Sequence, residues 1–125
     1  MEERLVLICD DDESIADTLG LIVESAAVHV LVEYQSENIV TRLKEQQVNM
    51  LIVDLWMPVM SGDMVIRQLR ADPVFKDLYI ICISASIDGR KVALDAGADV
   101  FVAKPFDMDD IIATVEQGFD KIGIR

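Results

Sequence analysis

The chain has 125 residues, 52% of them hydrophobic and 27% charged, and its 11 Lys and Arg against 23 Asp and Glu give a net charge of −12. This length and composition predict one globular domain, residues 1–125, and exclude a disordered or collagen-like chain. So acidic a surface repels phosphate backbones and anionic lipids, so we expect no direct binding to nucleic acid or membrane. Cys9 and Cys82 stand inside apolar runs, which is typical of reduced core thiols in a cytoplasmic protein.

Short apolar runs recur along the chain, and each is followed by a segment with a different spacing of apolar residues. Four runs are continuous and rich in β-branched residues, which is typical of strands buried on both faces of a parallel sheet. These runs are Leu5–Cys9, Met50–Val53, Leu78–Ile83 and Val100–Val102. A fifth run, Val28–Tyr34, alternates apolar with polar residues, and we predict a half-exposed strand at the edge of the sheet.

The segments between the strands have the three-and-four spacing of amphipathic helices. The clearest apolar stripes are Ile15, Leu19, Ile22 and Ala26, and then Met108, Ile111, Ile112, Val115, Phe119 and Ile122. Ser61 and Asp107 are predicted N-caps, and Gly97 is predicted to end the fourth helix. Five successive strand–helix units predict an α/β fold, an open doubly wound sheet of five parallel strands with helices on both faces.

Polar residues follow the predicted strands at the ends where such sheets bind ligands. They are Asp10, Asp11 and Asp12 after the first strand, Asp54 after the third, Ser84 after the fourth, and Lys104 with Pro105 after the fifth. Asp54 closes an apolar run and is followed at once by Leu55 and Trp56, which places it at the edge of the core rather than on a polar surface. All these groups should therefore converge on one edge of the sheet.

The residue types at this edge favour phosphoryl transfer. Neighbouring carboxylates repel one another, and a divalent cation such as Mg²⁺ removes that penalty while also binding phosphate. A carboxylate can act as the nucleophile, with a lysine and a hydroxyl to hold the phosphoryl oxygens. A P-loop nucleotidase is excluded because the chain has no Gly-rich loop ending in Lys-Ser or Lys-Thr. The only histidine, His29, lies on the predicted edge strand and is interpreted as a surface residue rather than a phosphodonor.

Four motifs at these strand ends resemble those of the receiver domain of two-component response regulators. They are Leu7–Asp12, Asp54–Pro58 with Met60–Gly62, Ile83–Ala85, and Gly97–Phe101 with Lys104–Phe106. The resemblance covers the chain from Arg4 to about Lys121, with the motifs in order and at matching spacing. It implies a flavodoxin-like sheet with strand order 2-1-3-4-5 and a single receiver domain over residues 1–125.

The resemblance also implies a role for each residue at the site. Asp54 would be the phosphoacceptor, and Asp11, Asp54 and the backbone carbonyl of Trp56 would bind Mg²⁺, or Mn²⁺ in its place, with Asp10 acting mainly through water. Lys104 would pair with Asp54 and then with the phosphoryl group, and Ser84 would hydrogen-bond a phosphoryl oxygen. Two further residues have structural roles: Pro105 would follow a cis peptide bond, and Phe101 would be the switch aromatic.

The implied function is a phosphorylation-controlled switch in the cytoplasm. A sensor histidine kinase or a histidine phosphotransfer protein would donate the phosphoryl group, and the surface of the fourth helix, fifth strand and fifth helix would change. The output would be a downstream protein or a fused domain, and the chain would catalyse only its own phosphorylation and dephosphorylation. The alternative is a receiver-like protein-interaction module that is not phosphorylated; the full set of acidic, hydroxyl and lysine positions argues against it.

Two residues in the loop after Asp54 depart from the family's pattern. Trp56 is bulky and is expected to shield an acyl phosphate from water, which would slow dephosphorylation. The alternative is that Ser86 and Asp88 position a water for hydrolysis. Val59 replaces a common glycine and is expected to give a stiffer or differently shaped turn. Phe101 lacks the hydroxyl of the tyrosine often found at the switch position, so its ring is expected to stay inward in both states.

Overall fold

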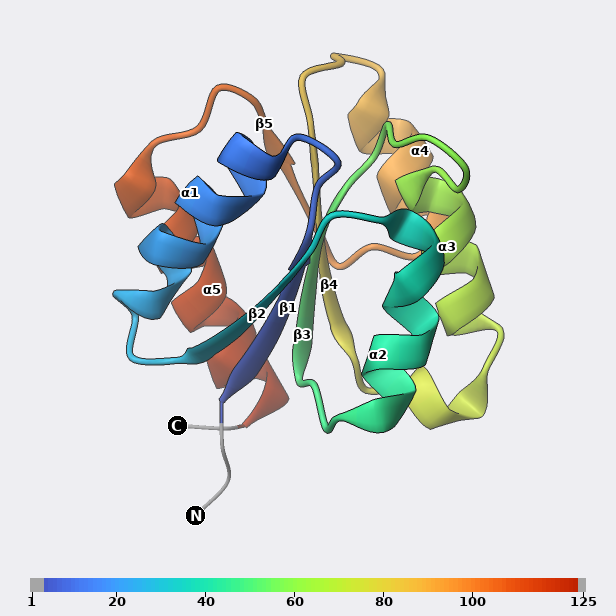
Figure 1. The fold of residues 1–125 in the computed structure, drawn as a ribbon, viewed down its shortest axis with the longest axis horizontal. Helices are drawn as coiled ribbons and strands as arrows, with labels where there is room; N and C mark the ends of the chain where they lie inside the picture. Colours follow the sequence, from blue (N-terminus) through green and yellow to red (C-terminus); the bar gives the residue numbers. More distant parts are fainter. Residues whose placement is uncertain (1–3, 124–125) are drawn as a thin grey trace.

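The structure, a computed structural model, describes residues 4–123. These residues form one parallel sheet of five strands in the order β2-β1-β3-β4-β5, flanked by helices on both faces (Figure 1). The strands are β1 (Leu5–Cys9), β2 (His29–Glu33), β3 (Met50–Asp54), β4 (Tyr79–Ser84) and β5 (Val100–Ala103). The α-helices are α1 (Glu13–Glu24), α2 (Ile39–Glu45), α3 (Gly62–Arg70), α4 (Gly89–Ala96) and α5 (Met108–Ile122), with 3₁₀ turns at Ser36–Asn38 and Pro73–Phe75. The predicted fold class and strand order are confirmed.

The sheet separates two hydrophobic layers. Helices α1 and α5 cover one face, and α2, α3 and α4 cover the other (Figure 1). Successive strand residues point to opposite faces, so Leu7 and Leu51 pack in the layer of α2 to α4, whereas Ile8 and Ile52 pack in the layer of α1 and α5. Both faces therefore need apolar side chains, which explains the continuous apolar runs of the central strands.

The strand boundaries differ from the sequence predictions by one residue or two. The edge strand β2 is shorter than predicted, because only His29–Glu33 pairs with β1, and four of its five residues are partly exposed. Strand β4 begins one residue later, at Tyr79, and includes Ser84, because the ladder to β5 continues as far as the pair Ser84 and Ala103.

Three helix ends were predicted, and the structure places all three where predicted. Two of them, however, lack the side-chain hydrogen bond expected of an N-cap. Gly97 ends α4 with φ +118°, a left-handed conformation that suits glycine. Ser61 and Asp107 occupy the predicted N-cap positions, but neither side chain bonds to a helix N–H group. The Ser61 hydroxyl donates to the Asp63 carboxylate at 2.6 Å.

Within residues 4–123, none of the helices combines the length and the apolar character that crossing a bilayer requires.

Candidate functional site

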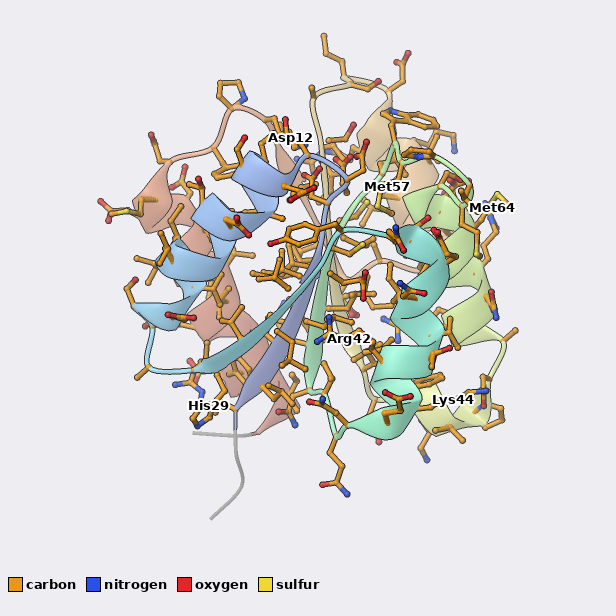
Figure 2. The ribbon with its side chains drawn as sticks, viewed as in Figure 1. Asp12, His29, Arg42, Lys44, Met57 and Met64 are labelled. Atoms are coloured by element: carbon orange, nitrogen blue, oxygen red, sulfur yellow. The ribbon has the colours of Figure 1, made fainter. Side chains whose placement is uncertain are left out.

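The carboxyl ends of β1, β3, β4 and β5 bring the predicted site residues to one edge of the sheet. The strand order reverses at β1, which has β2 on one side and β3 on the other, and the crevice at such a point is where open α/β sheets bind ligands. Asp10 directly follows β1, Asp54 and Ser84 are the last residues of β3 and β4, and Lys104 directly follows β5. In Figure 2, Asp12 lies at this end of the sheet and His29 at the opposite end, so the only histidine is remote from the site.

Three carboxylates form a cluster at this edge. Asp10, Asp11 and Asp54 each present a carboxylate oxygen, and these oxygens all lie within 4.8 Å of one another. Asp10 is only 1% exposed and Asp54 only 6%, whereas Asp11 is exposed. An all-oxygen set of this kind, buried on one side and open on the other, fits a hard divalent cation such as Mg²⁺, which keeps several of its waters.

Asp12, next to the cluster, has a structural role. Its carboxylate accepts hydrogen bonds from the backbone N–H groups of Ser14 and Ile15, at 3.0 and 3.3 Å, and so caps α1. Its own N–H donates to the Asp10 carboxylate at 3.0 Å. Asp12 is thus the N-cap of α1, and its backbone N–H orients the buried Asp10 side chain.

Lys104 joins two of the three carboxylates. Its Nζ lies 3.1 Å from Asp10 Oδ2 and 3.0 Å from Asp54 Oδ1. Its backbone N–H donates to the Ser84 carbonyl at 2.8 Å, and the peptide bond to Pro105 is cis, the conformation that the resemblance implied. Burial disfavours the ammonium, but hydrogen bonds to Asp54 and Asp10 outweigh it and raise the pKa of Lys104 above its ordinary value.

Asp54 is the carboxylate whose proton affinity changes most. Burial raises its pKa to about 6, the negative charges of Asp10 and Asp11 act in the same direction, and Lys104 opposes them. The ionised form is thus disfavoured in the cluster even with the ammonium in contact. A cation bound to the carboxylates would relieve this.

Ser84 and Phe101 lie on either side of the first turn of α4. Ser84 is 1% exposed, and its Oγ accepts a hydrogen bond from the Ser86 N–H at 3.0 Å. A Cβ built on Gly89 would come within 3.2 Å of both Ser84 Cβ and Phe101 Cε1, so α4 starts in contact with both side chains. The Phe101 ring is buried, with the Arg90 guanidinium 5.4 Å from its centroid. The ring is therefore inward in this structure.

The loop from β3 to α3 carries the remaining candidate, Trp56. Its side chain is 54% exposed, whereas Leu55 before it and Met57 after it are buried. Val59, in the same loop, has φ +70°, the left-handed region that favours glycine. The expectation of a stiffer or differently shaped turn stays a prediction. The assignment of the Trp56 carbonyl as a cation ligand stays a prediction.

Sequence reasoning missed one residue next to the site. Ser36 is 3% exposed, and its hydroxyl donates to the Pro58 carbonyl at 2.9 Å and accepts from the Met60 N–H at 3.2 Å. It belongs to the 3₁₀ turn before α2, more than twenty residues away in sequence from both partners. A lone serine in a loop carries no pattern that signals such a contact, so only the folded chain shows it.

The chain is similar in sequence to known proteins along most of its length. Residues 6–116 match the family model of the response regulator receiver domain. The cell cycle response regulator CtrA of Brucella ovis is 32% identical over 110 residues, which cover 88% of this chain and 47% of that protein. The uncharacterized transcriptional regulatory protein YkoG of Bacillus subtilis is 26% identical over 125 residues, 100% of this chain and 55% of that protein. The chain therefore spans about half the length of these relatives.

Solved structures resemble the chain over almost all of its length. A putative response regulator from Chloroflexus aurantiacus superposes with a TM-score of 0.90 at 25% identity, covering 95% of this chain and 99% of that one. A CheY-like receiver domain protein from Methanospirillum hungatei has the same fold, with a TM-score of 0.89 at 21% identity and 98% of both chains covered. Together with the family match over residues 6–116, these findings show that the chain belongs to the response regulator receiver domain family.

Proposed function

We propose that the chain is a phosphorylation-controlled switch of two-component signalling and that Asp54 accepts the phosphoryl group. A sensor histidine kinase or a histidine phosphotransfer protein is the expected donor. The observation that carries the proposal is the Lys104 ammonium, held within 3.1 Å of Asp10 and 3.0 Å of Asp54 inside a cluster of three carboxylates. This arrangement pairs a partly buried nucleophile with a positive charge fixed beside it.

Asp54, Lys104 and Ser84 have different roles in the proposed reaction. An Asp54 carboxylate oxygen attacks phosphorus and forms the new O–P bond, and the bond from phosphorus to the donor nitrogen breaks. Lys104 stays close throughout, because its second contact to Asp10 is kept when Asp54 is phosphorylated. Ser84, at the same edge, donates a hydrogen bond from its hydroxyl to a phosphoryl oxygen.

Asp10, Asp11, Asp54 and the Trp56 carbonyl would hold Mg²⁺, or Mn²⁺ in its place. When bound, the cation supplies the positive charge that neutralises the carboxylates and the phosphoryl oxygens. The oxygen-only donor set of the three carboxylates supports this choice over a softer metal.

The proposed change of the α4-β5-α5 surface depends on the contact of Ser84 and Phe101 with the first turn of α4. Movement of Ser84 towards a phosphoryl group would shift α4 against β5. The shape of the α4-β5-α5 surface, which a downstream protein or a fused output domain would contact, would then change. Because Phe101 is already inward, the change would involve the loop before α4 more than rotation of the ring. Residues 1–125 would act as a single receiver domain in the cytoplasm, catalysing only its own phosphorylation and dephosphorylation.

Fluorescence of Trp56, the sole tryptophan, tests the proposal. Mg²⁺ should change the emission, and subsequent addition of acetyl phosphate or beryllofluoride should change it again. Asp54→Asn should abolish the second step, whereas Asp77→Asn, an exposed acid in the turn before β4, should leave both steps intact. Mass spectrometry should find one phosphoryl group on the wild type and none on Asp54→Asn. No response to either addition would favour the unphosphorylated interaction module instead.

A further inference from the structure

The β3–α3 loop contains a strained turn three residues after Trp56. The Met60 N–H donates to the Pro58 carbonyl at 2.8 Å and closes a three-residue γ-turn around Val59. Val59 has φ +70°, which is unfavourable for a β-branched residue, and its side chain is 77% exposed. Packing of that side chain therefore does little to hold the turn, and other contacts have to do so.

Ser36 supplies such contacts from a different part of the chain. Its hydroxyl donates to the Pro58 carbonyl at 2.9 Å and accepts from the Met60 N–H at 3.2 Å, so one side chain spans both ends of the γ-turn. The residue is buried, and the two bonds satisfy its hydroxyl while adding a second partner to each of the two backbone groups that close the turn. Ser36 thus clamps the turn from the loop that follows β2.

The clamped turn is continuous with the site. The Leu55 N–H donates to the Ile83 carbonyl at 2.9 Å, and the Leu55 carbonyl accepts from the Gly62 N–H at 2.7 Å, so the two ends of the loop are anchored. Trp56 lies between the Leu55 anchor and the segment that Ser36 holds. Only Met57 and Pro58 separate Val59 from Trp56, so a more mobile backbone at Val59 would also make the Trp56 peptide more mobile.

We propose that Ser36 is a positioning residue for the cation site. By clamping the strained turn at Val59, it holds the Trp56 peptide where its carbonyl can join the three carboxylates. The inference rests on the proposed function, since it requires that the cluster binds Mg²⁺ with this carbonyl. It adds to that function a residue from the β2–α2 loop that touches neither the cation nor the phosphoryl group.

Mg²⁺ titrations of a small set of variants test the inference, with Trp56 fluorescence and calorimetry as independent readouts of the Kd. Ser36→Ala should weaken Mg²⁺ binding by about tenfold, the value of one to two lost hydrogen bonds. Ser36→Cys fills the same space with a weaker donor and should behave similarly. Ser36→Thr keeps the hydroxyl and should stay within about twofold of the wild type.

A second substitution separates positioning from general stability. Asparagine tolerates a positive φ far better than a β-branched residue and does not add the backbone freedom of glycine, so Val59→Asn should remove the need for the clamp. Ser36→Ala combined with Val59→Asn should therefore recover most of the lost Mg²⁺ affinity. A purely structural serine would lower the urea midpoint of unfolding in Ser36→Ala and leave the Kd unchanged.

The outcomes distinguish this inference from the proposed function. If the wild type shows no Mg²⁺ response by either readout, the proposed function itself fails. If the wild type binds Mg²⁺ and Ser36→Ala and Ser36→Cys bind it equally well, only the role of Ser36 is overturned. Loss of affinity that Val59→Asn does not restore would also overturn it, because the clamp would then not act through the strained turn.

Discussion

Replacing Asp54 by asparagine tests whether the carboxylate cluster is strained when no cation is bound. Burial is the main reason that the pKa of Asp54 is about 6, against an ordinary value of 3.8. A carboxyl group with a higher pKa in the folded state binds its proton more tightly there than in the unfolded chain. Its stabilising contribution is complete below the unfolded pKa and is lost as the pH rises through about 6. A difference of this size corresponds to about 3 kcal/mol of unfolding free energy at neutral pH.

The neutral amide mimics the protonated acid, so Asp54→Asn should be more stable than the wild type by about 1–3 kcal/mol at neutral pH in EDTA. The gap should close as the pH falls towards about 4. Urea unfolding followed by circular dichroism over this pH range measures both the stability difference and its dependence on pH. Asp77→Asn, at an exposed position, is the control. Saturating Mg²⁺ should stabilise the wild type more than the variant, because a ligand of the native state raises stability by mass action. A variant less stable than the wild type in EDTA would refute the reasoning, because the Lys104 contact would then outweigh burial.

Three further predictions concern Trp56, Arg70 and the cysteines. If Trp56 shields the acyl phosphate, Trp56→Ala should lose its phosphoryl group several-fold faster in a phosphate-affinity gel time course; loss from the wild type within seconds at neutral pH would contradict this. Arg70 bonds to Asp99 and to three backbone carbonyls, so Arg70→Ala should lower the unfolding free energy by about 2–4 kcal/mol in urea, and Arg70→Lys should not recover it fully. Burial raises the pKa of both Cys9 and Cys82 to about 12, so native stability should fall as the pH rises above 9, where unfolded thiols ionise first. Both thiols should react with Ellman's reagent only on unfolding; rapid reaction in the native state would contradict their burial.

Much of the fold was predictable because its causes are local. Strands buried on both faces need unbroken apolar runs such as Met50–Val53, and helices between them need the three-and-four spacing seen from Ile15 to Ala26. Parallel strands share one direction, so the residues that follow them had to meet at one edge. The boundaries were less certain, because pairing with a neighbour decides where a strand ends, as at Ser84 opposite Ala103.

The amino-acid sequence by itself therefore determined the elements, their approximate limits and the residue types that gather at the site. The tertiary structure alone decided which atoms touch, such as the Lys104 bridge to Asp10 and the absence of a capping hydrogen bond from Ser61 to α3. It alone showed that Ser36 clamps the turn at Val59. The physical reason is that periodicity reports which face of an element is apolar, whereas a hydrogen bond between distant segments depends on how whole layers pack and on which nearby group competes for the donor.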